Sequence, residues 1–166
     1  MNLQKSFQNA LDIIRLKEPA MQAVANDPEA TGPAWIFIVA GALATSLGVT
    51  FFPVQIGMVV YRPDLFWIVQ ATVFESLAML VGLYFGGYVA EKWFHSKLSM
   101  VGFVRVMGHA ALLGVLAIFP LLGILCLWNL VVWWRACTRI GKMQAQATVL
   151  FMVILVAATF LLSPFL

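Results

Sequence analysis

The sequence predicts an all-α integral membrane protein with five transmembrane helices and an amphipathic helix before the first of them. Two properties of the composition indicate that the chain is surrounded by lipid. The 166 residues are 63% hydrophobic and only 10% charged, and the mean hydropathy is +0.95. A soluble domain carries about 25% charged residues, so this chain cannot cover itself with a solvated surface. A third observation, the distribution of the basic residues, decides the number of spans.

The N-terminal segment, 1–32, is predicted to be cytoplasmic and to begin with an amphipathic helix over residues 3–18. Pro19 is expected to end or bend this helix. The helix is expected either to lie in the head-group plane or to pack on its own domain or a partner, since length and amphipathicity do not separate these alternatives. Its apolar side chains follow the spacing of one helical face and are Leu3, Phe7, Ala10, Leu11 and Ile14.

The remaining residues, 33–166, are predicted to form the transmembrane domain. A span requires about 20 apolar residues. The stretch 106–134 carries no charged residue and would form a single helix of roughly 43 Å, which is longer than a hydrocarbon core of about 30 Å. Pro120 supplies the break that divides it. The predicted spans cover residues 34–53, 65–90, 99–118, 120–138 and 145–163.

Charge favours five spans over four, because basic residues near spanning helices are retained on the cytoplasmic side. With four spans, Arg135, Arg139 and Lys142 would lie outside, and the ten basic residues would divide six against four. With five, only Arg62 lies outside, so we expect a cytoplasmic N-terminus and a C-terminus on the outer face. The nine inner residues are then Lys5, Arg15, Lys17, Lys92, Lys97, Arg105, Arg135, Arg139 and Lys142.

Three short runs occur in an order that is typical of one known family. They are Gly32-Pro33-Ala34-Trp35-Ile36, then Arg105-Val106-Met107-Gly108-His109-Ala110 leading to Phe119-Pro120-Leu121-Leu122-Gly123, and finally Arg139-Ile140-Gly141-Lys142. This order resembles the Yip family, the five-pass membrane domain of proteins that interact with Rab GTPases. The first run is similar to the tail of the eukaryotic Asp-Leu-Tyr-Gly-Pro-Phe-Trp motif, and the others are similar to a polar helix start with a Pro-x-x-Gly hairpin and to the polar loop before the last helix.

The chain also departs from the eukaryotic members. Thr31 and Glu29 stand where their motif has Tyr and Asp, and the cytosolic segment is much shorter than theirs. A Rab-type GTPase is therefore not expected as a partner. The sequence looks like a bacterial member in the cytoplasmic (inner) membrane. The resemblance implies a non-enzymatic membrane protein that binds or organises partners.

Three polar side chains are predicted to lie near the middle of the membrane. Glu75, His109 and Asn129 each fall about nine or ten residues from the end of a predicted span, roughly 15 Å deep. Adjacent antiparallel helices could bring them together. One interpretation is a proton-linked or polar-solute site, and the other, which we favour, is hydrogen bonding that holds the helices together.

A small-residue face is predicted to make helix–helix contacts. Gly82 and Gly86 form a small-xxx-small pair on the face of the second span that also carries Glu75. We therefore expect Glu75 to face protein and Gly82 and Gly86 to contact a partner, together with Phe7, Leu11 and Ile14 of the N-terminal helix. Arg105 is expected to reach lipid phosphate with its long side chain.

The sequence carries no pattern that indicates catalysis. It has no Gly-rich phosphate loop, nucleophile elbow, HExxH or CxxC pattern, so we expect no enzyme activity, no cofactor and no metal site. The basic residues lie at helix ends, which suits lipid head groups and disfavours nucleic acid. The leading hypothesis is a scaffold or accessory subunit that docks other membrane proteins or a second copy. The alternatives are a small transporter or proton-conducting protein that uses Glu75 and His109, and a membrane-shaping protein.

Overall fold

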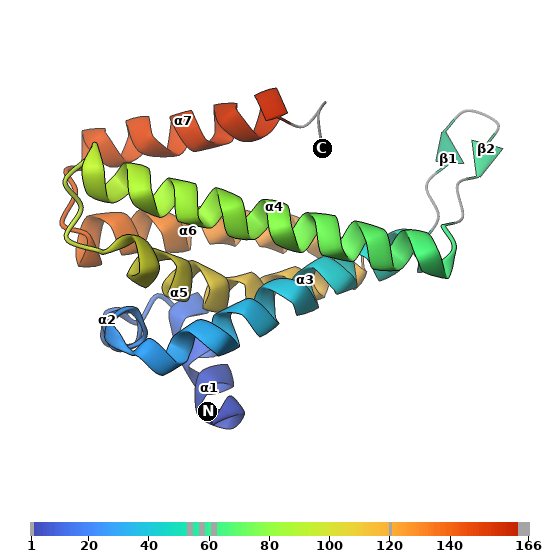
Figure 1. Cartoon of the computed structure of the whole chain (residues 1–166), viewed down its shortest axis with the longest axis horizontal. Coiled ribbons are helices and arrows are strands. Elements are labelled where there is room, and N and C mark those ends of the chain that lie inside the picture. The colour runs from blue at the N-terminus through green and yellow to red at the C-terminus, as the bar shows by residue number, and fades with distance from the viewer. Residues whose placement is uncertain (1, 53–54, 57–58, 61–62, 120, 163–166) are drawn as a thin grey trace.

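A computed structural model describes residues 2–52, 55–56, 59–60, 63–119 and 121–162 (Figure 1). The described chain is helical apart from a short antiparallel hairpin of two strands, β1 (Gln55–Ile56) and β2 (Val59–Val60). Several predicted features lie outside these residues. They are Pro53 at the end of the first span, Tyr61 and Arg62 of the following turn, the break at Pro120, and Pro164 after the last span.

The N-terminal segment forms two helices where the sequence predicted one. α1 covers Leu3–Ile14 and α2 covers Glu18–Asn26, and the short 3-10 helix η1 (Pro28–Ala30) follows. The predicted helix over 3–18 was too long because Leu16 adopts a left-handed backbone with φ 62°, which a helix cannot continue through. Pro19 stands in the first turn of α2, where its missing N–H removes no hydrogen bond.

Within the described part of the chain, three helices are long and apolar enough to span a membrane: Pro28–Phe51, Leu65–Lys92 and Met100–Ile118. They comprise α3 (Thr31–Phe51) with η1, then α4 (Leu65–Lys92), then α5 (Met100–Ala110) with the 3-10 helix η2 (Ala111–Ile118). The predicted span starts at 65 and 99 agree with capping side chains. Asp64 accepts from the Trp67 N–H at 2.8 Å, and Ser99 accepts from the Gly102 N–H at 3.1 Å.

The predicted spans 120–138 and 145–163 remain predictions. The region of the fourth predicted span contains the 3-10 helix η3 (Leu122–Leu127), α6 (Trp128–Arg135) and a π-helical turn, η4 (Ala136–Ile140). The region of the fifth contains α7 (Ala145–Leu162), with a shorter apolar helix over Ala145–Ala157.

A seam of small residues joins α3 to α5 and η2. A Cβ atom added at Gly48 would lie 2.5 Å from the Ala117 carbonyl oxygen, and one at Gly108 would lie 2.6 Å from Ala34 Cβ. Between them, Gly41 and Gly114 face each other, and an added Cβ at Gly114 would lie 3.0 Å from Gly41 Cα. Only glycine permits backbones to approach this closely, so this seam sets the packing of two of the candidate spans.

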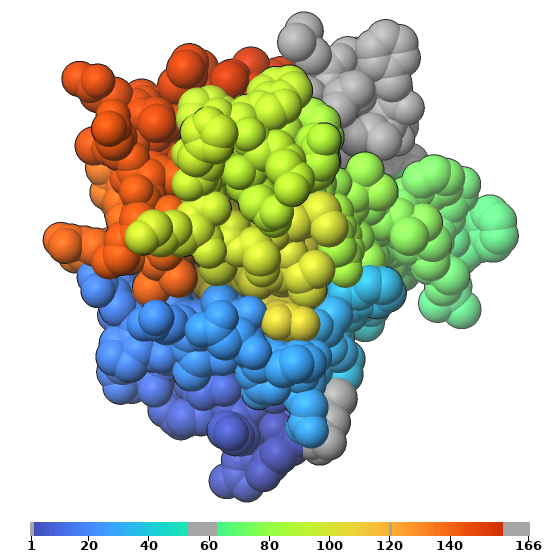
Figure 2. Space-filling view, turned by 60° about the vertical axis from the view of Figure 1, so that its left-hand side comes forward, coloured from blue at the N-terminus to red at the C-terminus, as the bar shows by residue number. Residues whose placement is uncertain are grey.

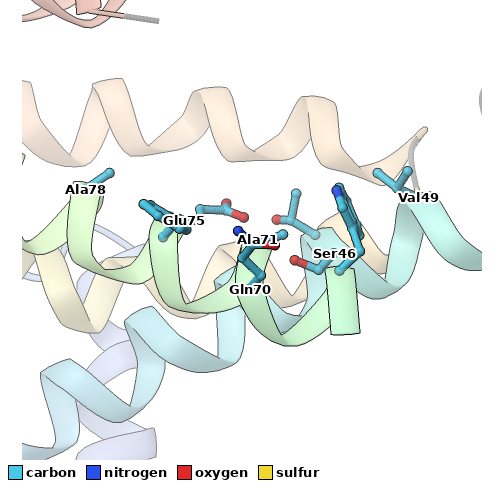
Figure 3. Close-up of a pocket in the computed structure, with 9 residues that line it drawn as sticks. Ser46, Val49, Gln70, Ala71, Glu75 and Ala78 are labelled. Carbon is cyan, nitrogen blue, oxygen red and sulfur yellow. The ribbon is translucent and has the colours of Figure 1, made fainter. Parts of the chain in front are cut away.

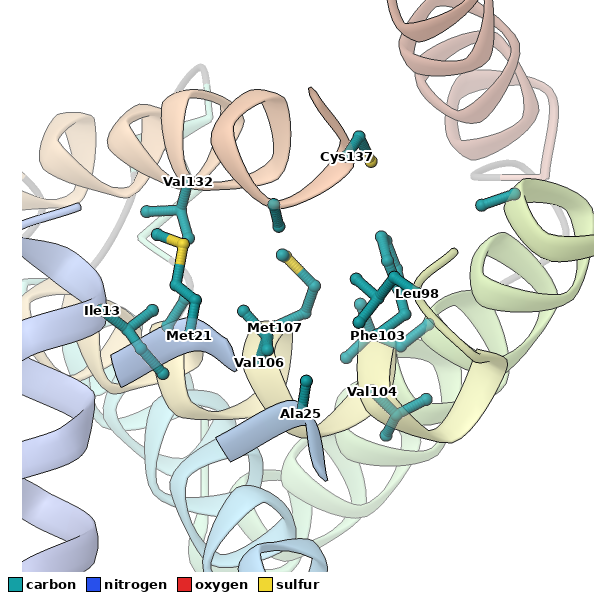
Figure 4. Packing of buried hydrophobic residues seen from close by; sticks show 14 of the residues in the cluster. Ile13, Met21, Ala25, Leu98, Phe103, Val104, Val106, Met107, Val132 and Cys137 are labelled. Carbon is teal, nitrogen blue, oxygen red and sulfur yellow. The ribbon is translucent and has the colours of Figure 1, made fainter. Parts of the chain in front are cut away.

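The buried core surrounds α5, where every residue except Met100, Val101 and Arg105 is buried. Figure 4 shows Phe103, Val106 and Met107 of α5 among Met21 of α2 and Val132 of α6. α1 joins this core through Ile13, which is fully buried, whereas Phe7 remains 48% exposed. α1 therefore packs on its own domain, which was one of the two predicted alternatives, and it does so through a face centred on Ser6, Ala10 and Ile13.

Three basic segments meet at one end of the molecule. The Lys97 N–H donates to the Gly141 carbonyl at 2.7 Å, and Glu18 of α2 lies 3.5 Å from Arg139 and 3.7 Å from Arg135. Figure 2 shows the blue N-terminal helices, the yellow-green turn after α4 and the orange residues before α7 adjoining each other. The β1–β2 hairpin lies at the opposite end in Figure 1. This arrangement agrees with the predicted charge asymmetry, while the side that faces the cytoplasm stays a prediction.

Candidate functional site: a polar pocket between two candidate spans

A pocket of about 660 Å³ opens between the C-terminal half of α3 and the N-terminal half of α4. Figure 3 shows Gln70 and Glu75 of α4 around this pocket with Ser46 and Val49 of α3. The small side chains of Ala71 and Ala78 leave the space open. The complete lining is Thr45, Ser46, Val49, Trp67, Gln70, Ala71, Phe74, Glu75 and Ala78.

Glu75 is the one ionisable residue of this lining, and no Lys, Arg or His accompanies it there. Glu75 is exposed on the surface of the chain. A polar neighbour in the lining is Thr45 of α3, whose hydroxyl donates to the Gly41 carbonyl oxygen at 3.1 Å. Because that hydrogen is engaged by Gly41, the carboxyl of Glu75 keeps unused acceptor capacity.

The hydroxyl groups beside the pocket are largely engaged by backbone carbonyls. Thr72 donates to the Ile68 carbonyl at 2.8 Å, Ser76 to the Thr72 carbonyl at 2.7 Å, and Thr50 to the Ser46 carbonyl at 3.1 Å. The Thr72 hydroxyl oxygen also lies 3.3 Å from Ser46 Oγ, which joins α4 to α3. A hydroxyl that has donated its hydrogen offers only lone pairs. The region is therefore rich in acceptors and suits a cation or an N–H donor.

The structure places Glu75 and His109 against different parts of α3. His109 packs edge-on against Phe37 of α3, with ring centroids 5.3 Å apart, whereas Glu75 neighbours Thr45. Phe37 and Thr45 are eight residues apart on α3, a rise of about 12 Å. The estimate from sequence used depth alone, and depth does not determine which helix face a side chain occupies.

His109 and Asn129 each have one buried atom without a hydrogen-bond partner. His109 Nδ1 lies 2.8 Å from the Arg105 carbonyl oxygen, while its Nε2 and the Oδ1 of Asn129 are unpaired among the described residues. Neither side chain lines the pocket of Glu75. The hydrogen-bonding role that the sequence suggested for Glu75, His109 and Asn129 therefore stays a prediction.

Gly82 and Gly86 have different surroundings. A Cβ at Gly86 would lie 3.3 Å from Leu155 of α7, so Gly86 already packs within the chain. A Cβ at Gly82 would meet nothing within 4 Å. Of the predicted pair, Gly82 is therefore the one with an open face toward another molecule. It follows Glu75 by seven residues, about two turns, so the two lie on one side of α4.

The N-terminal residues that were predicted to contact a partner differ in their exposure. Phe7 is exposed, Leu11 is partly buried, and the Ile14 carbonyl accepts from Trp128 Nε1 at 2.8 Å. Arg105 was expected to reach lipid phosphate, and this was wrong. Its guanidinium donates to Thr31 Oγ1 at 2.9 Å and to the Ala25 carbonyl at 3.0 Å, which fastens α5 to the N-terminal segment.

Sequence reasoning missed most of the pocket. Thr45, Ser46 and Gln70 were not selected, although their polar side chains stand in two largely apolar predicted spans, which was the available signal. It also missed the true small-residue seam, although Ala34, Gly41 and Gly48 recur every seven residues. Residues seven apart lie on one helix face, so this repeat could have indicated a contact surface.

Among the described residues, no group of three or more His, Cys, Asp or Glu side chains could hold a metal ion. No protein-family model, curated protein or solved structure matches this chain. The α3–α4 pocket and the resemblance described above are the features of the chain that bear on its function.

Proposed function

We propose that this chain is a non-enzymatic membrane partner protein, a scaffold or accessory subunit that docks another membrane protein at the α3–α4 pocket. The observation that carries this proposal is the Glu75 carboxyl, which stands in a lateral pocket between two candidate spans without a basic neighbour in its lining. A charged side chain at the bilayer centre costs about 2.5 kcal/mol or more, so such residues usually pair with another group. A Lys, Arg or amide side chain on a partner's transmembrane segment would supply that group.

The surface around Glu75 supports docking of a helix. Only 11% of the most apolar window of α4 is buried within the chain, compared with 44% and 50% for the other two candidate spans. Gly82, two turns from Glu75, leaves its face open. A second helix can approach closely at such a glycine while a polar pair forms nearby.

Charge favours a different protein over a second copy of this chain. In a two-fold symmetric dimer the same patch occurs on both subunits, so two Glu75 carboxyls would come close to each other. Like charges at short distance repel, and no Lys or Arg occurs in 34–60 or 65–90 to compensate.

The test uses a defined probe, because the partner is unidentified. The full chain is reconstituted in neutral lipid vesicles with a synthetic Leu-rich transmembrane peptide that carries one central Lys, and association is measured by energy transfer. A matched peptide has Leu in place of Lys. Membrane polar contacts contribute about 0.6–1.7 kcal/mol, so the Lys peptide should associate about threefold to twentyfold more strongly. Glu75→Gln should remove most of this preference, and Glu29→Gln, which lies in η1 and does not line the pocket, should retain it.

Two results would overturn the proposal. Equal association of both peptides with the unmodified chain would show that Glu75 attracts no cationic partner. Equal loss in Glu75→Gln and Glu29→Gln would show that the effect comes from net charge. Retained thermal unfolding of both variants serves as the folding control.

Two other functions stay open to experiment. A small transporter or proton-conducting protein is supported by the polar pocket, but the separation of Glu75 from His109 gives no continuous path between them. Proton or solute flux in proteoliposomes that is lost in Glu75→Gln would favour a transporter.

Membrane shaping is supported by exposed Leu3 and Phe7 of α1 and predicts vesicle tubulation that disappears in Phe7→Asp. The proposal has two further parts. We propose that the chain lies in a bacterial cytoplasmic membrane with its N-terminus inside and its C-terminus outside, and that it is related to the Yip family.

A further inference from the structure

A second, chemically different groove lies on another side of the molecule, where the end of α1 meets η2, η3 and α6. Its volume is about 640 Å³. Its lining is mostly apolar, and three of the lining residues are well exposed: Ile124 at 68%, Leu125 at 47% and Leu127 at 62%. The complete lining is Ile14, Arg15, Leu113, Ile124, Leu125, Leu127, Trp128 and Val131.

One hydrogen bond joins α1 to α6 beside the groove. Trp128 Nε1 donates to the Ile14 carbonyl at 2.8 Å, at the C-terminal end of α1, where helix carbonyls otherwise lack a partner. This bond fixes the end of α1 against α6. The segment from Ile14 to Arg15 then forms one edge of the groove, and η3 forms the other.

Arg15 is the one charged residue of the lining, and it forms no ion pair among the described residues. The carboxyl of Asp12 binds Lys17 at 2.9 Å. The hydrogen bond from Lys17 and the nearby charges of Lys17 and Arg15 lower the pKa of Asp12, so Asp12 stays ionised and bound to Lys17, while the donors of Arg15 are left for another acceptor. Arg15 is itself exposed at the edge of the groove.

The two ends of the groove differ in their relation to the membrane. Arg15 belongs to the N-terminal segment, before the first candidate span, whereas Leu113 lies within the candidate span Met100–Ile118. A bound molecule with an anionic head and an apolar tail would match both ends, with the head at Arg15 and the tail along Leu113 and Leu125. Arginine is the side chain best suited to binding phosphate, because its guanidinium offers several donors in a fixed plane.

We infer that this groove binds one anionic phospholipid, with its phosphate on Arg15 and one acyl chain between η2 and η3. The inference does not depend on the α3–α4 pocket, since the two sites share no residue. A partner helix would also be apolar, but the exposed Arg15 at the edge, which forms no ion pair among the described residues, favours a lipid phosphate as the occupant.

The experiment compares lipids that differ only in the head group. The full chain in neutral detergent is titrated with dioleoyl phosphatidylglycerol, with dioleoyl phosphatidylcholine or with inorganic phosphate, and bound lipid is counted by native mass spectrometry. The anionic lipid should bind about fivefold or more tightly than the neutral lipid, as expected for one basic residue near a phosphate. Inorganic phosphate should not compete at the same concentration, because it has no chain to occupy the groove.

Variants separate the two halves of the site. Arg15→Gln should reduce the preference for the anionic lipid to near one, while Lys5→Gln, which removes the same charge at the other end of α1, should retain it. Leu125→Trp, which fills the groove, should weaken both lipids. Equal binding of the two lipids to the unmodified chain, equal effects of Arg15→Gln and Lys5→Gln, or full competition by inorganic phosphate would each overturn the inference. Unchanged thermal unfolding of the variants before lipid is added excludes misfolding as the cause.

Discussion

The close seam between α3 and η2 makes a quantitative prediction for a single methyl group. In Gly48→Ala the new Cβ would lie 2.5 Å from the Ala117 carbonyl oxygen and 3.1 Å from that of Ile118. Both neighbours are backbone atoms, so no flexible side chain can move aside. Ordinary contact begins at 3.4 Å, so the two helices would have to separate by roughly 0.9 Å.

Gly82→Ala is the matched control. Gly82 also lies inside a long helix, but an added Cβ there meets nothing within 4 Å. Both substitutions gain the same helix propensity, about 0.5–1 kcal/mol, so this contribution cancels when the two variants are compared. Overpacking of a well-packed contact costs about 1–3 kcal/mol. Gly48→Ala should therefore be less stable than Gly82→Ala by about 1–3 kcal/mol.

The measurement is the free energy of unfolding in mixed micelles, from a dodecyl sulfate titration followed by helical circular dichroism. Gly82→Ala is expected to be as stable as the unmodified chain or slightly more stable. If the two variants agree within about 0.5 kcal/mol, the spread expected of independent sites, α3 and η2 do not approach as closely as the glycine contacts indicate. The reasoning about the seam would then be wrong.

Three further predictions concern the N-terminal segment and the arrangement in the membrane. Arg105→Gln removes charged hydrogen bonds to the Ala25 carbonyl and to Thr31, each worth about 1.5–3 kcal/mol, so it should lower the free energy of unfolding. It should also accelerate tryptic cleavage after Lys17, and unchanged cleavage would contradict this role of Arg105. Trp128→Phe keeps an aromatic ring but removes the N–H that donates to the Ile14 carbonyl, so the free energy of unfolding should fall by about 0.5–1.5 kcal/mol. An unchanged free energy of unfolding would show that this hydrogen bond contributes nothing. In single-cysteine variants, Lys97→Cys and Lys142→Cys should react with an impermeant reagent from the same side of sealed vesicles, and Leu65→Cys from the other side. Labelling of positions 97 and 142 from opposite sides would exclude the arrangement in which the Lys97 N–H donates to the Gly141 carbonyl.

The start of each well-predicted helix depended on local chemistry that is visible in the sequence. Asp64 and Ser99 cap α4 and α5 through hydrogen bonds within three residues, so their positions were readable without knowledge of the fold. The helix over 3–18 failed for a related reason. The left-handed backbone at Leu16 is unfavourable for leucine and has no sequence signal, since it is imposed by the docking of α1 and α2 on α5.

Arg105 shows why the environment of a side chain was harder to predict than its depth. From the sequence it stands near a helix start and resembles a residue that reaches lipid phosphate. Its actual acceptors, Ala25 and Thr31, lie more than 70 residues away along the chain. A long side chain binds whichever acceptor the fold places nearest, so the bond follows from tertiary packing.

The sequence by itself determined that lipid surrounds much of this chain, because so few charges cannot solvate a surface, and it identified Glu75 as a costly residue that requires an explanation. Only the tertiary structure decided which faces meet. It placed Glu75 beside Thr45 and apart from His109, covered Gly86 while leaving Gly82 open, and placed Arg15 at the edge of an apolar groove. Hydropathy and charge are properties that sum over a segment, whereas contacts depend on helix rotation and on close backbone approach. A single sequence does not report those quantities.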